Sequence, residues 1–215
     1  NFFNTCLSSI LNVTDTFDTL VVVNDGALEI DSELLTDVNV YINHEKNQGV
    51  GPSKNDTIKS LLDQGCEHLF LIEDDVLIND PETLLKYIRA SEVTGIKHLN
   101  FCLHGDDNKF KGTPVPKLVV DYGELKLALY HNLYGALSYY HRDVIDDIGL
   151  MDEQYRNAME HVDHTMQACV KGYHPPFRWF ADLLESDKLI HEQDQSHEKS
   201  KIRNEQQWVD DFKFG

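Results

Sequence analysis

The sequence contains few cysteines, and they do not cluster. Cys6, Cys66, Cys102 and Cys169 lie far apart among 215 residues, and no two of them form a CxxC pair. Disulfide-rich small domains and structural zinc sites depend on closely spaced cysteines. We therefore expect free, buried thiols in a reducing compartment.

Long apolar runs and an excess of positive charge are also missing. No run approaches the ~18 apolar residues that a bilayer crossing needs, and no signal-peptide pattern opens the chain. Lys and Arg number 19 against 37 Asp and Glu, which gives a formal net charge of -18. Such a charge excludes nucleic acid and anionic membranes as main partners. We expect a cytoplasmic protein, or one held at the inner face of a membrane through regions outside this sequence.

The first half of the chain alternates between strand and helix patterns. Residues 2–13 have the three- and four-residue apolar spacing of a helix. Ser53 is a plausible N-cap, and Gly65 a plausible C-cap, for a second helix. The alternation predicts right-handed βαβ units and a mostly parallel sheet. The expected strands are 19–23, 38–42 and 68–72, and the expected helices after the first are 54–64 and 81–91.

The second half is less regular, and we expect it to form part of the same single domain, residues 1–215. We expect this domain to divide into two halves, about 1–103 and about 104–215. The polar stretch 185–203 predicts a mobile C-terminal segment. We expect a strand at 97–103, a long loop or hairpin at 104–124, strands within 125–140, and helices at 142–148 and 157–171.

Polar clusters follow three of the predicted elements at one edge of the sheet. They are Asp25, the segment 49–54 and the acidic triplet Glu73-Asp74-Asp75. Ligands of parallel α/β sheets bind beyond the carboxyl ends of the strands. Adjacent carboxylates at the end of a buried strand repel one another, and a hard divalent cation with oxygen ligands removes that cost. The triplet therefore predicts a Mn²⁺ or Mg²⁺ site.

The order of these motifs carries a family resemblance. Val-Val-Val-Asn-Asp-Gly ends at residue 26, Asn-Gln-Gly-Val-Gly-Pro-Ser-Lys-Asn ends at residue 55, and Leu-Ile-Glu-Asp-Asp ends at residue 75. This order resembles the GT-A-fold glycosyltransferases, especially family 2. The resemblance implies an α/β GT-A fold, with a mainly parallel central sheet flanked by helices. The family's first strand, which would precede the helix at 2–13, has no counterpart in this sequence.

The resemblance also implies roles for the residues of the first half. Asp25 would contact the nucleobase of a nucleotide sugar, and Lys54 would lie near the base or the phosphates. Asp75 would be the main metal ligand. Glu73 and Asp74 would face the ribose or metal-bound water.

A second block, from Gly149 to Tyr155 and then at 159–164, is similar to the family's Gly-x-Phe-Asp-Glu motif and the acidic helix start that follows it. The acceptor hydroxyl must lose a proton as it attacks the sugar. His161 stands where family members often carry an aspartate base. Histidine has a suitable intrinsic pKa, and Glu160 and Asp163 are the alternatives, with Glu160 preferred.

The resemblance further implies a late histidine as a metal ligand. His191 fits that position, and His197 competes with it. Three basic residues follow, Lys199, Lys201 and Arg203, and we expect them to neutralise the departing diphosphate.

The implied activity is a hexosyl- or N-acetylhexosaminyltransferase of polysaccharide biosynthesis. It would move a sugar, with inversion, from a nucleotide-diphosphate donor such as a UDP-sugar to a hydroxyl of a glycan or glycolipid. The chain would then be a domain that a longer multidomain enzyme can contain. One alternative is a GT-A-like module that binds nucleotide sugars or glycans without turnover. Another is a zinc metallohydrolase using His161, Asp163 and His164. No GxGxxG follows the first strand, which argues against a Rossmann dehydrogenase.

Overall fold

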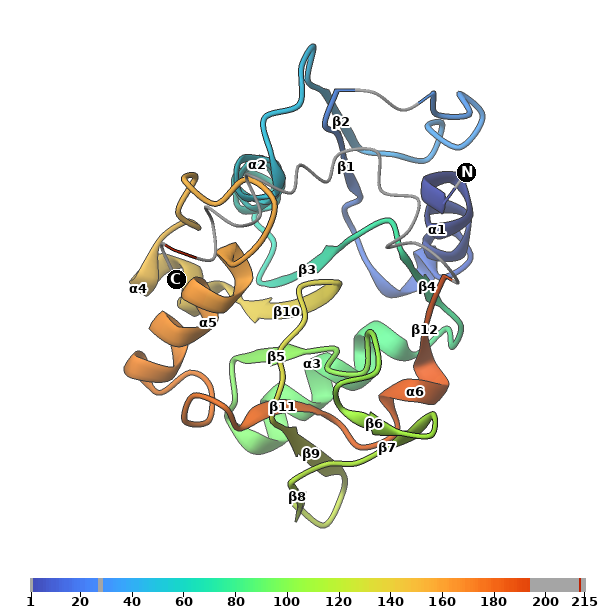
Figure 1. Ribbon diagram of the computed structural model, residues 1–215. Coiled ribbons are helices and arrows are strands. Elements are labelled where there is room, and N and C mark those ends of the chain that lie inside the picture. Colours follow the sequence, from blue (N-terminus) through green and yellow to red (C-terminus); the bar gives the residue numbers. More distant parts are fainter. Residues whose placement is uncertain (1, 27–28, 194–212, 214–215) are drawn as a thin grey trace.

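The computed structural model describes residues 2–26, 29–193 and 213. In Figure 1 the strands run down the middle of the molecule, from β1 and β2 at the top to β8 at the bottom. Helices α2, α4 and α5 lie on the left of this view, and α1 and α6 on the right. The first half of the chain places its elements as α1 (Phe2–Leu11), a 3-10 turn (Thr14–Thr16), β1 (Val21–Asn24), β2 (Val40–Asn43), α2 (Val50–Asp63), β3 (His68–Ile72), β4 (Val76–Ile78), α3 (Thr83–Thr94) and β5 (His98–Asn100).

The second half contributes short strands and three helices. A small hairpin and β8 occupy the stretch that the sequence predicts as a loop or hairpin. The elements are β6 (Lys109–Phe110), β7 (Thr113–Pro114), β8 (Leu118–Asp121), β9 (Lys126–Tyr130), β10 (Leu137–His141), α4 (Arg142–Ile148), α5 (Glu160–Lys171), β11 (Phe180–Leu183), α6 (Ser186–Leu189) and β12 (Ile190–Glu192).

The strand pairing differs from the predicted parallel sheet. Among the described residues β1 and β2 form the one parallel pair, whereas β3 and β5 each pair with β10 in antiparallel fashion. The sheet containing β9 is antiparallel as well. In this part of the chain β1 and β3 share no ladder, and residues of both line one cavity. The sequence predicted β1, α2 and β3 in this order along the chain. It did not predict that β10, from the second half of the chain, pairs with β3 in antiparallel fashion.

Helix α2 begins earlier than the sequence predicts. Its first residue is Val50 and its N-cap is Gly49, which has a φ of 104°. Pro52 therefore lies in the first turn, where a missing N–H costs nothing. Ser53 is inside the helix and donates from Oγ to the Gly49 carbonyl at 2.9 Å, so it is not the N-cap.

A buried carboxylate ties three elements of the lower half together. Asp182 on β11 is fully buried, and it accepts from the Tyr87 hydroxyl at 2.6 Å and from the Cys102 N–H at 2.9 Å. Burial raises the pKa of Asp182 to about 6 in spite of these hydrogen bonds. All four cysteines are free thiols, as the sequence predicts, and Cys6 and Cys102 are buried.

Candidate functional site

A cavity of about 2100 Å³ opens at the carboxyl ends of β1 and β3. This exceeds the roughly 300–1,000 Å³ of pockets for one small ligand, so a donor and an acceptor both have room. The predicted site residues of the described chain reach this cavity, with His191 as the exception. Its lining includes Asp25, Lys54, Glu73, Asp74, Asp75, Glu160, His161 and Asp163. The structure therefore brings residues that lie up to 138 positions apart in sequence to one space.

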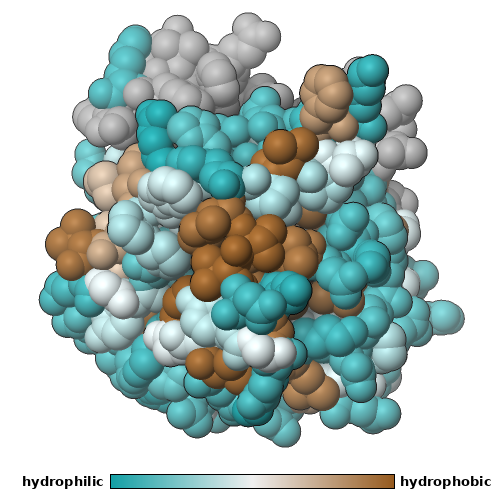
Figure 2. Space-filling model, turned by 90° about the horizontal axis from the view of Figure 1, so that it is seen from below, coloured by the Kyte–Doolittle hydropathy of each residue, from teal (hydrophilic) through white to brown (hydrophobic). Residues whose placement is uncertain are grey.

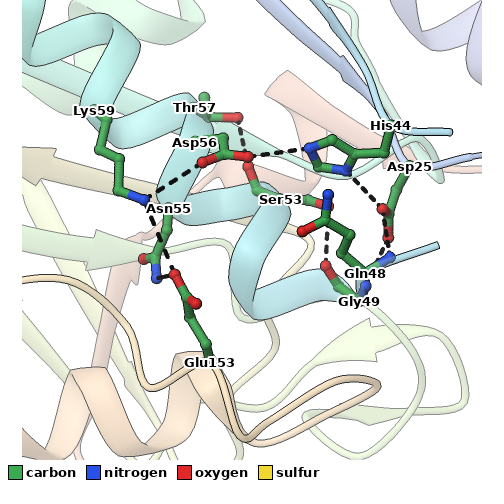
Figure 3. Close-up of polar contacts among 10 residues, drawn as sticks. All are labelled: Asp25, His44, Gln48, Gly49, Ser53, Asn55, Asp56, Thr57, Lys59 and Glu153. Atoms are coloured by element: carbon green, nitrogen blue, oxygen red, sulfur yellow. Dashed lines mark hydrogen bonds and ion pairs between the residues drawn. The ribbon is translucent and has the colours of Figure 1, made fainter. Parts of the chain in front are cut away.

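Asp25 fastens the loop before α2. Its Oδ1 accepts from the Gln48 N–H and its Oδ2 from the Gly49 N–H, both at 2.8 Å. His44 Nδ1 lies 2.7 Å from Oδ1, and His44 Nε2 lies 3.0 Å from Asp56 Oδ2 on α2 (Figure 3). Asp25 was expected to contact a nucleobase. In the structure its carboxylate has three protein partners, so it fixes the loop before α2 at the wall of the cavity.

His44 supports Asp25 from outside the cavity lining, and the sequence analysis did not single it out. It directly follows β2, at the same sheet edge as Asp25, and that position was the signal for it. Burial alone lowers the pKa of His44, but the hydrogen bonds and charges of Asp25 and Asp56 outweigh burial and raise the pKa. The ring bridges two carboxylates, and both of them favour its protonated form.

The variant His44→Gln should show a weaker dependence of stability on pH than the unmodified chain. Since the folded-state pKa of His44 is raised, its contribution is complete below the unfolded-state value of about 6.5 and is lost as pH rises through the folded-state value. Urea unfolding at pH 6 and pH 8.5 tests this. The stability difference between the two proteins should shrink at the higher pH, and an unchanged difference contradicts the bridge.

Two glycines at the start of α2 allow the backbone of another segment to pack closely against it. A Cβ at Gly49 would lie 2.7 Å from the Arg156 carbonyl oxygen, and one at Gly51 would lie 2.7 Å from the Tyr155 carbonyl oxygen. The Val50 N–H donates to the Arg156 carbonyl at 2.9 Å. These contacts explain why small residues stand at both positions. They join the loop before α2 to the block that leads into α5.

Lys54 is buried at the centre of an ion-pair cluster. Its Nζ lies 2.5 Å from Glu73 Oε1 and 2.8 Å from Glu160 Oε1, and it donates to the Gly135 carbonyl at 3.2 Å. Burial alone lowers the pKa of Lys54, but the two carboxylates raise it well above its ordinary value. An ammonium has three N–H bonds, and all three have protein acceptors here. The structure thus differs from the expectation that Lys54 faces the base or phosphates: it neutralises two acids.

Glu160 and His161 form a hydrogen-bonded pair at the start of α5. His161 Nδ1 lies 3.1 Å from Glu160 Oε1, and Glu160 is 1% exposed. Burial alone raises the pKa of Glu160, yet the charges of Lys54 and His161 hold it well below its usual range. A carboxylate with so low a pKa is a weak base. Among the residues that the structure describes, His161 Nε2 has no hydrogen-bond partner, and His161 lines the cavity.

Local backbone features position this pair. Met159 precedes α5 with a φ of 75°, a left-handed conformation that a non-glycine residue adopts only at a cost. A Cβ at Gly135 would lie 2.8 Å from His161 Nδ1 and 3.1 Å from Glu73 Oε1. Only glycine leaves room for both side chains. Asp163, the third candidate base, accepts from Gln167 Nε2 at 2.8 Å.

The acidic triplet meets a second histidine that the sequence analysis missed. His104 is buried, with Nε2 at 3.4 Å from Asp75 Oδ2 and Nδ1 at 3.6 Å from Glu192 Oε2. It follows β5 within an apolar run, which made it resemble a core residue. Asp74 is exposed, and its pKa is raised by incomplete hydration and by the charge of Glu73. Asp74 and Asp75 both line the cavity, so their carboxyl groups lie beside the space in which a ligand would bind.

A divalent cation would fit beside Asp74 and Asp75 only together with ligands from outside the protein. Within the ranges that the structure describes, no three His, Cys, Asp or Glu side chains converge as a metal site. Mg²⁺ and similar ions are commonly held by one or two carboxylates together with substrate phosphates and water. Asp74 and Asp75 supply such a partial donor set. The chain would then hold the ion together with the nucleotide.

Other predicted site residues lie elsewhere. His191 is exposed on β12 and does not line the cavity. Successive side chains of a strand point to opposite faces. The neighbouring Glu192, and not His191, therefore contacts His104. Lys199, Lys201, Arg203 and the competing His197 lie outside the described residues. His164 is buried with Nε2 at 2.9 Å from the Gly149 carbonyl, and it forms no metal-ligand group with His161 and Asp163.

Comparison with known proteins identifies one type of fold. Neither a family model nor a curated protein matches the sequence. A crystal structure of S. aureus TarS, residues 1–349, matches with a TM-score of 0.60 and 16% sequence identity, and it covers 91% of this chain. The fold is glycosyltransferase-like. TarS is a wall teichoic acid glycosyltransferase, and this chain spans 57% of the length of the matched TarS chain.

The glycosyltransferase-like fold is consistent with the cavity at the strand ends. At this level of identity the match establishes the fold, whereas the donor, the acceptor and the metal remain proposals. In the described part of the chain, no helix has both the length and the apolar character that crossing a membrane requires.

Proposed function

We propose that this chain transfers a sugar from a nucleotide-diphosphate donor, a UDP-sugar, to a hydroxyl of a glycan or glycolipid, with inversion and with help from Mn²⁺ or Mg²⁺. The observation that carries the proposal is the shared cavity. One end is built by Asp25 and the acidic triplet, and the other by Glu160 and His161, in a glycosyltransferase-like fold.

His161 is the proposed general base. Glu160 holds Nδ1 and so favours the ring tautomer whose Nε2 accepts a proton. As the acceptor oxygen attacks the anomeric carbon, its proton passes to Nε2. The bond between that carbon and the diphosphate oxygen breaks, and the electron pair leaves with the nucleoside diphosphate. Attack from the face opposite the leaving group inverts the anomeric configuration.

Glu160 supports this step in a second way. Its Oε1 contacts both Lys54 and His161, and its Oε2 is buried without a hydrogen-bond partner among the described residues. Native proteins rarely leave a buried carboxylate oxygen unsatisfied. Since Glu160 also lines the cavity, a bound hydroxyl group of the acceptor would satisfy it.

The metal, when bound, would neutralise charge on the diphosphate as it departs. Asp74 and Asp75 are the proposed protein ligands, since both line the cavity next to Glu73, whose carboxylate is paired with Lys54. Lys199, Lys201 and Arg203 remain candidates for the same task, and His191 remains a weaker candidate as a metal ligand because of its exposed position.

A thermal-shift screen tests the donor site. UDP, UDP-sugars and other nucleotide diphosphates are added with and without Mn²⁺. A nucleotide at 100 times its Kd should stabilise the fold by about 2.7 kcal/mol. The stabilisation should depend on the metal and should be lost on adding EDTA or in Asp75→Asn.

Turnover is then measured as release of the nucleoside diphosphate from the stabilising donor with glycan acceptors. The control is Asp80→Asn, which changes an acid of similar type in the loop before α3. No stabilisation by any nucleotide, with or without metal, contradicts the donor site. Metal-dependent binding without any turnover favours the alternative of a non-catalytic binding module.

A further inference from the structure

Two cations lie side by side just before β8 and β11, and neither pairs with a carboxylate of the described residues. They are Lys117 and Arg178, whereas most other lysines and arginines in this part of the chain form an ion pair. Lys117 Nζ donates to the Arg178 carbonyl at 3.0 Å and lies 3.9 Å from the centre of the Trp179 ring. In a chain with 37 acidic and 19 basic residues, cations that no acid neutralises are available to a ligand.

The backbone at Arg178 is strained and held in place. Its φ is 68°, in the left-handed region that a non-glycine residue adopts only at a cost. The Trp179 N–H donates to the Pro176 carbonyl at 2.9 Å and closes the turn, while Lys117 holds the Arg178 carbonyl from outside. Strain of this kind is concentrated at sites that bind ligands. The turn therefore presents the arginine in a defined position before any ligand arrives.

The same turn reaches the large cavity, which is lined by Arg178, Phe177 and His131. Arg178 Nη1 lies 3.5 Å from His131 Nε2, and both side chains are exposed. At that separation both nitrogens can donate to one anionic oxygen placed between them, once His131 is protonated. Phe177 is 39% exposed and packs edge to face against Phe180, with 5.4 Å between the ring centres. Its ring therefore offers a fixed apolar surface to a sugar next to the two cationic groups.

The segment that carries His131 leads directly to the proposed general base. Gly135 lies four positions further on and packs against His161, so the backbone between positions 131 and 135 spans roughly 14 Å at most. The buried Asn108 fixes this segment. Its Nδ2 donates to the Asn132 carbonyl at 2.8 Å, and its Oδ1 accepts from the Asn132 N–H at 3.1 Å. One extended glycan can therefore contact both the cationic groups and His161.

The surroundings of the two cations do not neutralise them. Asp107 also lines the cavity, but its carboxylate accepts from the Tyr134 hydroxyl at 2.8 Å and forms no ion pair with Arg178. On the other side the chain continues into β8, where Leu118 is 48% and Val119 is 42% exposed. Figure 2 views the molecule from this end and shows apolar side chains gathered in the middle of the face. The positive charge therefore stays available at the cavity wall.

We propose that Arg178 and His131 bind an anionic group, a phosphate or a carboxylate, on the glycan acceptor. This inference rests on the proposed function, since it assigns a class of acceptor to the same cavity. A guanidinium group binds the oxygens of a carboxylate or phosphate through two parallel hydrogen bonds. A chain with a net charge of -18 repels an acidic glycan. Arg178, with the charge of Lys117 beside it, offsets that repulsion where the acceptor enters.

Isothermal titration with hexagalacturonate, phosphorylated maltohexaose and neutral maltohexaose tests the proposal. An anionic probe should bind about tenfold more tightly than the neutral one, and the preference should decrease as salt is added. Arg178→Asn should remove most of this preference, because asparagine tolerates the left-handed backbone and carries no charge. Arg178→Lys should keep part of it, since the charge remains while the paired hydrogen bonds are lost. The anionic probe that binds more tightly distinguishes a carboxylate from a phosphate.

The matched control is Lys111→Asn. Lys111 is exposed, has a φ of 50° and lies outside the cavity lining, so its loss should leave the preference unchanged. Thermal unfolding shows that each variant is folded. The proposal is overturned if neither anionic probe binds, if the neutral probe binds equally well, or if Arg178→Asn and Lys111→Asn have equal effects. The titrations contain no nucleotide, so a failure of the donor site appears separately, in the thermal-shift screen.

Discussion

Replacing Lys54 by methionine is expected to lower the free energy of unfolding by about 3–5 kcal/mol at pH 7. Methionine fills a similar space but leaves Glu160, 1% exposed, and Glu73 without their shared ammonium. An uncompensated buried carboxylate loses its hydration without gaining a partner. Urea unfolding measures the change.

The matched control is Lys59→Met, one further turn along α2. The side chain of Lys59 is 49% exposed, and its contact with Asp56 is 3.4 Å, so its removal should cost less than about 1 kcal/mol. The double variant Lys54→Met/Glu160→Gln should regain much of the loss, since a neutral amide costs less to bury. Equal effects at positions 54 and 59 would show that the cluster is solvated.

The stability of the Lys54 variant should also depend on pH in a defined direction. In the unmodified chain the pKa of Glu160 is held low, so its contribution is complete above about pH 4.3 and is lost as pH falls below that value. Without Lys54, burial raises the pKa of Glu160. The difference in free energy of unfolding between the unmodified chain and the Lys54 variant should therefore become smaller as pH falls from 7 toward 5.

Replacing His161 by glutamine is expected to lower the rate of sugar transfer by about 10²- to 10⁴-fold, the usual contribution of a general base. Donor binding in the thermal-shift assay should stay unchanged, because His161 acts on the acceptor. The rate of sugar transfer at saturating donor measures the change.

The control for this change is His141→Gln. Its side chain is 17% exposed, against 18% for His161, and it contacts Glu67 and Asp143 instead of cavity acids. It should transfer sugar at the unmodified rate. If Asp163→Asn abolishes transfer while His161→Gln retains it, Asp163 is the base and the assignment of His161 is wrong.

Much of the fold was predictable because local patterns decide it. The helices at α1 and α4 and the strand β3 follow from apolar spacing, and the structure has them within a few residues of the predicted ranges. The start of α2 was predicted four residues late, because Gly49 and Pro52 read as loop residues. Their roles depend on the backbone of 155 and 156, which is distant in sequence.

The sequence predicted which residues belong to the candidate site better than it predicted the contacts among them. Strand ends pointed to Asp25 and the triplet, and all of them line the cavity. The sequence did not distinguish His44 and His104 from core histidines. It also did not show that Lys54 pairs with two acids or that His191 lies outside the cavity lining. Pairings across more than 100 residues, such as Lys54 with Glu160, leave no trace in local spacing.

The sequence by itself indicated many of the strands and helices of the first half and placed carboxylates after buried strands, because both depend on short-range apolar periodicity. Only the tertiary structure decided which charges neutralise one another and which stay open to a ligand. Desolvation and Coulomb attraction act through distance in space, so the pairing of Lys54 with two acids, and the open Nε2 of His161, arise only when β3, α2 and α5 meet.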